Sequence, residues 1–214
     1  MRPASLPALL GLSAALMITI GIVGAGTVIT GEEDPPTEEG FETTPLADLD
    51  SSAVVVQRTA FCGDIDSRQV EAALGAPAED EKSWENGDRI KLPNGKRDVV
   101  HEYGCEYAAA DGTVASGWVF APPVTQTRAQ RLVRTASRTP GCVVLEGPSY
   151  GDPSVALSCV DGDGYVVNHR GLFGDAWLTC ELAVPTPPSD EPLDLDDLED
   201  RAGRWCVGVA LAAS

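Results

Sequence analysis

The N-terminal part of this sequence lacks charge. No Asp, Glu, Lys or Arg lies at residues 3–31. Within this stretch, the apolar run at residues 6–29 is broken only by small or weakly polar residues, and about 20 apolar residues suffice to cross the hydrocarbon core of a bilayer. We therefore expect residues 1–30 to form a transmembrane anchor, with residues 6–29 in the membrane.

A cleaved secretory signal is the alternative for this segment, because the small residues at 23–25 would suit a signal peptidase. The apolar region of such a signal is usually about 7 to 15 residues long, shorter than the run found here. The direction of insertion follows from charge in either case. Arg2 precedes the run, whereas residues 31–50 hold eight carboxylates and no Lys or Arg. The sequence thus predicts a single-pass protein of the cell membrane with its C-terminal domain outside.

Cysteine is absent from the first 61 residues, which excludes a lipid-modified cysteine at the end of the apolar run. All six cysteines follow: Cys62, Cys105, Cys142, Cys159, Cys180 and Cys206. An even number in an exported domain indicates three disulfides. Six cysteines allow 15 pairings. Among them we expect the sequential one: Cys62 with Cys105, Cys142 with Cys159, and Cys180 with Cys206.

Metal-binding patterns are scarce. No two cysteines have the CxxC spacing, and the chain has only two histidines, His101 and His169, which argues against a zinc site. The acidic stretch at residues 161–164 lacks the further oxygen ligands of a calcium loop and is read as a turn. Both histidines lie beside apolar strand residues, so we expect them to be partly buried and structural. No metal and no cofactor is expected.

Basic residues are few as well. After residue 59 the chain has 25 acidic and 13 basic residues, which argues against binding to nucleic acid or to an anionic membrane surface. Residues 31–59 are acidic, contain prolines and have few large apolar groups, so we expect a disordered tether. The remaining residues, 60–214, are enough for one extracytoplasmic domain with its own core.

Periodicity predicts the elements of that domain. Expected helices lie at residues 67–74, from Thr127 onward, and at about 194–213. Expected strands lie around residues 99–107, 114–121, 142–145, 155–160, 165–168 and 177–184, after a hairpin turn at 93–96. The fold class is α+β, an antiparallel sheet with helices packed on one face and held by disulfides.

One loop matches a catalytic motif. Residues 147–151 have the G-x-S-x-G pattern around Ser149, and Asp161 or Asp163 followed by His169 supplies the order Ser, Asp, His. A nucleophile elbow needs a strand, a sharp turn and a helix in a doubly wound sheet, whereas this loop joins two antiparallel strands. No catalytic residue is therefore assigned. A wall-associated serine hydrolase using Ser149 is kept as the alternative function.

One basic feature stands against the acidic background. Four arginines, Arg128, Arg131, Arg134 and Arg138, recur at helical spacing along the second predicted helix, opposite its apolar face. We call these four residues the arginine ridge. It would suit an anionic cell-wall component or an acidic envelope protein. The alternative is a solvated helix face whose charges pair with neighbouring carboxylates.

Several short motifs are shared with a known group of domains. They are Phe61-Cys62-Gly63, Ala73-Leu74-Gly75, Gly104-Cys105-Glu106-Tyr107, Gly117-Trp118-Val119-Phe120, Ser154-Val155-Ala156-Leu157 and Trp205-Cys206. In layout, residues 60–214 resemble an uncharacterised actinobacterial envelope-lipoprotein domain family, similar to the extracellular sensor domain of a mycobacterial serine/threonine kinase. The resemblance implies a disulfide-bonded α+β domain that binds something outside the membrane and catalyses no known reaction. This chain differs in lacking a lipid-anchoring cysteine and a kinase domain, and in having three possible disulfides.

The sequence thus predicts a membrane-anchored extracytoplasmic binding or sensor-like module of the cell envelope. Its ligand is not specified by any motif.

Overall fold

A computed structural model describes residues 41–91, 95–162, 164–186 and 193–214. The anchor predicted at residues 6–29 and the first part of the predicted tether lie outside these residues. In the part of the chain that the structure describes, no helix is both long enough and apolar enough to span a bilayer.

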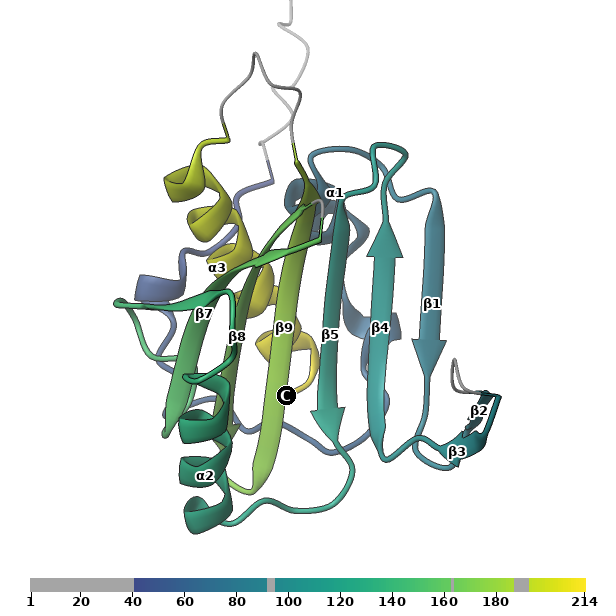
Figure 1. The fold of residues 1–214 in the computed structure, drawn as a ribbon, viewed down its shortest axis with the longest axis vertical. Coiled ribbons are helices and arrows are strands. Elements are labelled where there is room, and N and C mark those ends of the chain that lie inside the picture. The colour runs from purple at the N-terminus through teal and green to yellow at the C-terminus, as the bar shows by residue number, and fades with distance from the viewer. Residues whose placement is uncertain (1–40, 92–94, 163, 187–192) are drawn as a thin grey trace, which may run out of the picture. The chain divides into compact units, whose positions relative to one another are not determined.

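The folded part is built on an antiparallel sheet of seven strands (Figure 1). Their order across the sheet is β1-β4-β5-β9-β8-β7-β6. The strands are β1 (Asp80–Trp84), β4 (Glu102–Ala108), β5 (Val114–Phe120), β6 (Cys142–Leu145), β7 (Ser154–Asp161), β8 (Gly164–Phe173) and β9 (Ala176–Pro185). The predicted antiparallel α+β class is confirmed.

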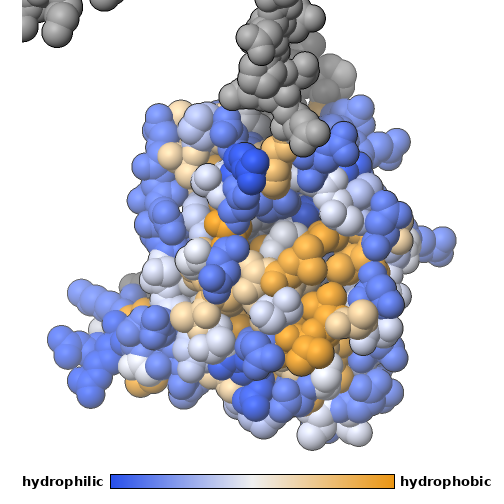
Figure 2. Space-filling view, turned by 180° about the vertical axis from the view of Figure 1, so that it is seen from behind, coloured by the Kyte–Doolittle hydropathy of each residue, from blue (hydrophilic) through white to orange (hydrophobic). Residues whose placement is uncertain are grey.

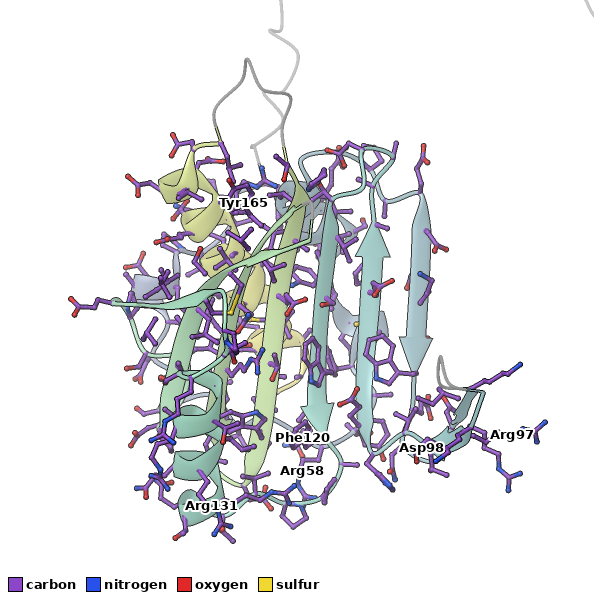
Figure 3. The ribbon with its side chains drawn as sticks, viewed as in Figure 1. Arg58, Arg97, Asp98, Phe120, Arg131 and Tyr165 are labelled. Carbon is purple, nitrogen blue, oxygen red and sulfur yellow. A yellow bond between two sulfur atoms is a disulfide. The ribbon has the colours of Figure 1, made fainter. Side chains whose placement is uncertain are left out.

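A small separate hairpin extends beyond the sheet. It pairs β2 (Arg89–Lys91) with β3 (Arg97–Val99), as the turn residues predict. All six of its strand residues are exposed, and Figure 3 shows Arg97 pointing away from the sheet. His101 follows the hairpin outside β4 and is exposed, so the expectation that it is partly buried is wrong.

The helices cover both faces of the sheet. α1 (Ser67–Leu74) and α3 (Leu195–Ala212) lie behind the sheet in Figure 1, whereas α2 (Gln126–Ala136) lies in front of β7 and β8. Because neighbouring strand residues point to opposite faces, Cys180 of β9 meets α3 while Trp177 of the same strand packs on the α2 side. The prediction of helices on one face is wrong, because an apolar stripe shows that a helix is buried but not which sheet face buries it.

α3 supplies the centre of the core. Trp205 is fully buried, its indole N–H donates to the carbonyl of Ser116 at 2.9 Å, and its ring meets the edge of Tyr107 at 6.0 Å. A methyl group on Gly117 would come within 2.8 Å of Val209, so a glycine in β5 permits the close approach of α3. A buried aromatic with a satisfied N–H anchors the helix to the sheet through both packing and a hydrogen bond.

Two of the three predicted disulfides are present. Cys142–Cys159 joins β6 to β7, and Cys180–Cys206 joins β9 to α3. Cys62 and Cys105 are free thiols that interact with each other. A hydrogen bond from the Cys105 thiol lowers the pKa of Cys62, and the same contact together with burial raises the pKa of Cys105. The third bond stays a prediction.

The chain before Ala60 forms a strap across the helix side. It contains the short 3₁₀ helix η1 (Leu46–Asp48), and Leu46 and Val56 are buried in the main core. Arg204 of α3 donates to the carbonyl of Thr43 at 2.6 Å. Residues 41–59 therefore belong to the folded part rather than to a disordered tether, because a few well-spaced apolar side chains suffice when α3 offers them a surface.

The far end of the strap is fastened where β5 ends and β8 turns into β9. Arg58 donates to the carbonyl of Ala121 at 2.6 Å and pairs with Asp175 at 3.1 Å. Figure 3 shows Arg58 beside Phe120, at the end of β5. The strap is thus held at both ends, and its η1 segment forms one wall of the site described next.

Candidate functional site

A cavity of about 220 Å³ lies on the helix side, where four segments meet: η1, the first half of α3, the β6–β7 loop and strands β7 and β8. We call it the His169 cavity. It is lined by Pro45, Leu46, Ala47, Leu145, Glu146, Gly147, Pro148, Ala156, His169, Glu199, Asp200 and Gly203. Figure 2 views the molecule from this side and shows apolar residues gathered in one area of the surface.

His169 is the polar residue of the sheet that lines this cavity. It lies on β8, paired with Ala156 of β7 and Cys180 of β9, and its side chain points to the α3 face. Only 6% of the residue is exposed, and neither ring nitrogen has a hydrogen-bond partner among the described residues. Burial lowers the pKa of His169 to about 4, so the ring is neutral at physiological pH. A neutral imidazole offers one donor and one acceptor.

The loop between β6 and β7 fixes the position of this ring. Tyr150 packs edge-on against His169, with ring centroids 6.1 Å apart, and against Phe173 at 5.1 Å. The Tyr150 backbone carbonyl lies so close to Gly171 of β8 that any side chain there would collide with it. The Tyr150 hydroxyl is also buried without a partner, and burial raises its pKa. The loop therefore packs closely against β8 beside His169.

Carboxylates lie around the cavity, and no Lys or Arg lines it. Asp200 accepts a hydrogen bond from the Arg204 guanidinium at 2.7 Å, which neutralises it. Glu146 and Glu199 form no ion pair with any residue that the structure describes. Burial, with a further contribution from Asp196, raises the pKa of Glu199. The cavity thus combines apolar walls, a neutral buried imidazole and two unpaired acidic groups.

The residues of the hypothetical serine hydrolase are not assembled. Ser149 is exposed in an irregular loop between two antiparallel strands, not at a strand-to-helix turn. Neither nitrogen of His169 has a partner, so no bond joins it to Ser149 or to an acid. Asp161 precedes His169 by eight residues and pairs with Gly164 at the β7–β8 turn. Because a strand rises about 3.3 Å per residue, the five residues from Gly164 to His169 put this turn roughly 16 Å from His169. Asp163 lies outside the described residues.

The arginine ridge lies on the other face of the sheet. Arg128, Arg131 and Arg134 are on α2, whereas Arg138 follows two residues after its last residue, so only three of the four share the helix. All four are exposed, and none forms an ion pair with a described carboxylate. Figure 3 shows Arg131 on the outer side of α2. The ridge is therefore accessible, and its role in binding stays a prediction.

No metal centre is evident in the described residues, where no group of three or more His, Cys, Asp or Glu side chains could hold an ion. The sequence analysis predicted that His169 is a partly buried structural histidine, and the residue is buried. What sequence reasoning missed is the cavity, because its lining comes from segments more than 150 residues apart. The one available signal was a histidine in an apolar strand beside a loop rich in glycine and proline.

Comparisons with known proteins add little. No protein-family model matches the chain, and no curated protein matches it. One solved structure with a detectable likeness is the immunity protein TplEi of a T6SS from Pseudomonas aeruginosa, complexed with "L" peptide. The two are 16% identical with a TM-score of 0.30, and the match covers 69% of this chain and 62% of that one. A likeness this weak supports no inference about function.

Proposed function

We propose that this chain is a membrane-anchored extracytoplasmic binding module, sensor-like in character, and that its ligand occupies the His169 cavity. The observation that carries the proposal is the histidine itself: a ring only 6% exposed, with both nitrogens unpartnered, lining an open cavity. The uncharged leader and the two disulfides support a site of action outside the membrane. The similarity to the envelope-lipoprotein family stays a hypothesis consistent with this proposal.

In the free protein, the buried ring of His169 carries an energetic cost. A buried polar group without a hydrogen bond costs about 1 to 3 kcal/mol, and an apolar ring of the same shape would avoid that cost. A ligand that reaches a ring nitrogen, by displacing the side chains that cover it, removes this penalty on binding. Since the cavity is smaller than the roughly 300 to 1,000 Å³ of most drug-sized sites, the ligand is a small molecule or one protruding group of a larger one.

The chain offers a direct readout for occupancy of this cavity. It has only two histidines, one buried in the cavity and one exposed, so ring NMR signals of His169 and His101 separate site binding from general effects. The full chain in detergent would be titrated with a low-molecular-weight extract of the cell envelope. We expect the His169 signals to shift while those of His101 do not.

A cavity-filling variant tests whether the shift reports the cavity. Ala156→Leu adds bulk beside His169 on the neighbouring strand, and it should abolish the shift. Ala183→Leu is the control, because this half-buried strand alanine lies on the other face of the sheet. A shift that persists in Ala156→Leu, or an extract that moves neither histidine, would refute the cavity as the ligand site.

Two further measurements address location and the ridge. Fractionation should place the chain in the membrane, with the cysteines of its two disulfides protected from alkylation. A cytosolic protein with all thiols reactive would refute the proposed location.

The double variant Arg128→Gln with Arg131→Gln should weaken retention on anionic wall fractions. The control Arg89→Gln with Arg97→Gln on the hairpin should not weaken it. Equal retention of both variants would remove the ridge from the proposal.

The alternative function, a wall-associated serine hydrolase using Ser149, is kept because the loop that carries this residue also lines the His169 cavity. We expect no labelling by a fluorophosphonate probe, since the described residues place no base in hydrogen-bond contact with Ser149. Labelling that disappears in Ser149→Ala would favour the enzyme over the binding module.

A further inference from the structure

We infer that the His169 cavity selects a small organic cation: a protonated amine carried on a short apolar body. This inference rests on the proposed function, because it names the chemical class of ligand for the same site. Three features of the cavity carry it, namely its walls, its charges and the state of the histidine.

The walls favour an apolar body. Leu46 of η1 and Leu145 of β6 belong to the lining, together with Pro148 and Ala156. Gly203 of α3 lets Leu46 approach, because a methyl group at this position would lie 3.2 Å from the Leu46 side chain. An alkyl chain entering this space loses contact with water and gains stabilisation in proportion to its apolar area, about 25 cal/mol per Å².

The charges favour a positive head group. Glu146 and Glu199 have no ion pair in the described structure, and the one further carboxylate of the lining, Asp200, is already paired with Arg204. No Lys or Arg of the lining would compete for them or attract an anion. Glu199 is partly withdrawn from water, which strengthens its interaction with a bound cation relative to a fully solvated carboxylate. An anionic ligand would instead add a third unpaired negative charge.

The histidine favours a donor head group without adding charge of its own. Because burial keeps the ring neutral, one of its nitrogens is an acceptor without a partner among the described residues. Both nitrogens are buried, so an ammonium N–H donates to this acceptor only when the lining side chains shift to admit the head group. A protonated ring would repel a cation, so neutrality is a condition of this recognition. The lining of the cavity thus combines a neutral ring with two carboxylates that form no ion pair among the described residues.

Three probes with the same alkyl chain and different heads test the inference: n-butylammonium, n-butanol and butanoate. Each would be titrated at pH 7 into the full chain in detergent, with the His169 and His101 ring signals followed by NMR. We expect n-butylammonium to bind at least about tenfold more tightly than n-butanol, because hydrogen bonds to charged groups are roughly twice as strong as neutral ones. Butanoate should not shift the His169 signals.

Two carboxylate variants show whether the charge of the cavity is responsible. Glu199→Gln should weaken butylammonium binding by about tenfold, whereas Glu71→Gln removes the same charge from an exposed position of α1 and should change it less than about twofold, since exposed charges are screened by salt. Ala156→Leu should abolish binding altogether. Equal binding by Glu199→Gln and the unaltered protein would overturn the inference.

The outcomes separate this inference from the proposed function. If n-butanol or butanoate binds as tightly as the amine, and Ala156→Leu abolishes that binding, the cavity remains the ligand site and the preference for a cation is wrong. If none of the three probes shifts the His169 signals, the cation inference is wrong, while the cavity itself is judged by the envelope extract described above.

Discussion

The substitution His169→Phe should make the protein more stable while removing its ligand site. Phenylalanine keeps a flat ring in the same place but has no polar atoms to leave unpaired. The two ring nitrogens of His169 are buried without partners, a condition that costs about 1 to 3 kcal/mol. We expect the free energy of unfolding at pH 7 to rise by about 1 to 2 kcal/mol, which raises the melting temperature by roughly 2 to 8 °C for a folded part of this size.

The effect should grow in acid, because the histidine couples stability to pH. The pKa of His169 is about 4 in the folded chain and about 6.5 when unfolded, so between these values the unfolded state binds a proton that the folded state does not. The free energy of unfolding of the unaltered protein therefore has its full value with respect to His169 above pH 6.5. It decreases by about 3 kcal/mol as the pH falls toward 4. His169→Phe lacks this loss, so its advantage should widen by about that amount.

Denaturant unfolding of the full chain at pH 7, 5.5 and 4 measures both effects. Carboxylates also titrate in this pH range, but they do so in both proteins. The difference between the two curves of unfolding free energy against pH therefore reports His169. Tyr150→Phe is the matched control: it removes another buried, unpartnered group, the hydroxyl, from a residue in contact with His169, and it titrates far above this range.

Tyr150→Phe should therefore preserve the pH dependence and the binding of probes in the cavity. The reasoning is refuted if His169→Phe is no more stable than the unaltered protein at pH 7. It is also refuted if the free energy of unfolding depends on pH in the same way in both proteins. Either result would mean that the nitrogens of His169 are satisfied in the free protein.

Three further predictions concern the scaffold. Gly104→Ala should destabilise the fold by about 1 to 3 kcal/mol in denaturant unfolding, because its methyl group would lie 2.5 Å from the Trp84 indole; Gly63→Ala, where nothing lies within 4 Å, should cost less than about 1 kcal/mol, and equal costs would contradict the packing argument. Reduction of each of the two disulfides should lower the free energy of unfolding by about 3 kcal/mol in the chain-entropy account. An unchanged melting temperature in reductant would show that the disulfides do not stabilise the fold. Thiol titration of the denatured, unreduced exported protein should find no free thiol, because Cys62 and Cys105 are close enough to interact and oxidation should join them; two reactive thiols per chain would show that the third bond does not form.

Local features of the sequence predicted much of the framework. The helix expected at residues 67–74 is α1, where the Asp66 side chain accepts from the Arg68 N–H and Gly75 ends the helix in the left-handed region. The start of α2 was placed two residues late, because Thr125 rather than Thr127 caps it. Both residue types cap helices well, and only the path of the preceding loop decides between them.

The cysteines also show which pairings follow from local structure and which depend on the tertiary fold. Cys142 and Cys159 lie on adjacent antiparallel strands only 17 residues apart, so a sequential pairing follows from the hairpin. Cys180 and Cys206 meet because α3 packs on β9, which the apolar stripe of α3 indicated. Cys62 lies in the short η2 segment (Cys62–Asp64), whose position depends on the path of the strap across the helix side, and no periodicity reports that path.

The sequence by itself predicted the antiparallel α+β class and most of the elements, because periodicity, capping residues and short loops act over a few residues along the chain. It did not predict the edge strand β1, and it left the disulfide pairing as one expectation among 15. Tertiary structure alone decided that α2 lies opposite α3, that residues 41–59 join the core, and that His169 meets a loop, a strap and a helix around one cavity. These outcomes depend on which surfaces are complementary once all elements are present. A pattern within one element carries no record of the partner that will cover it.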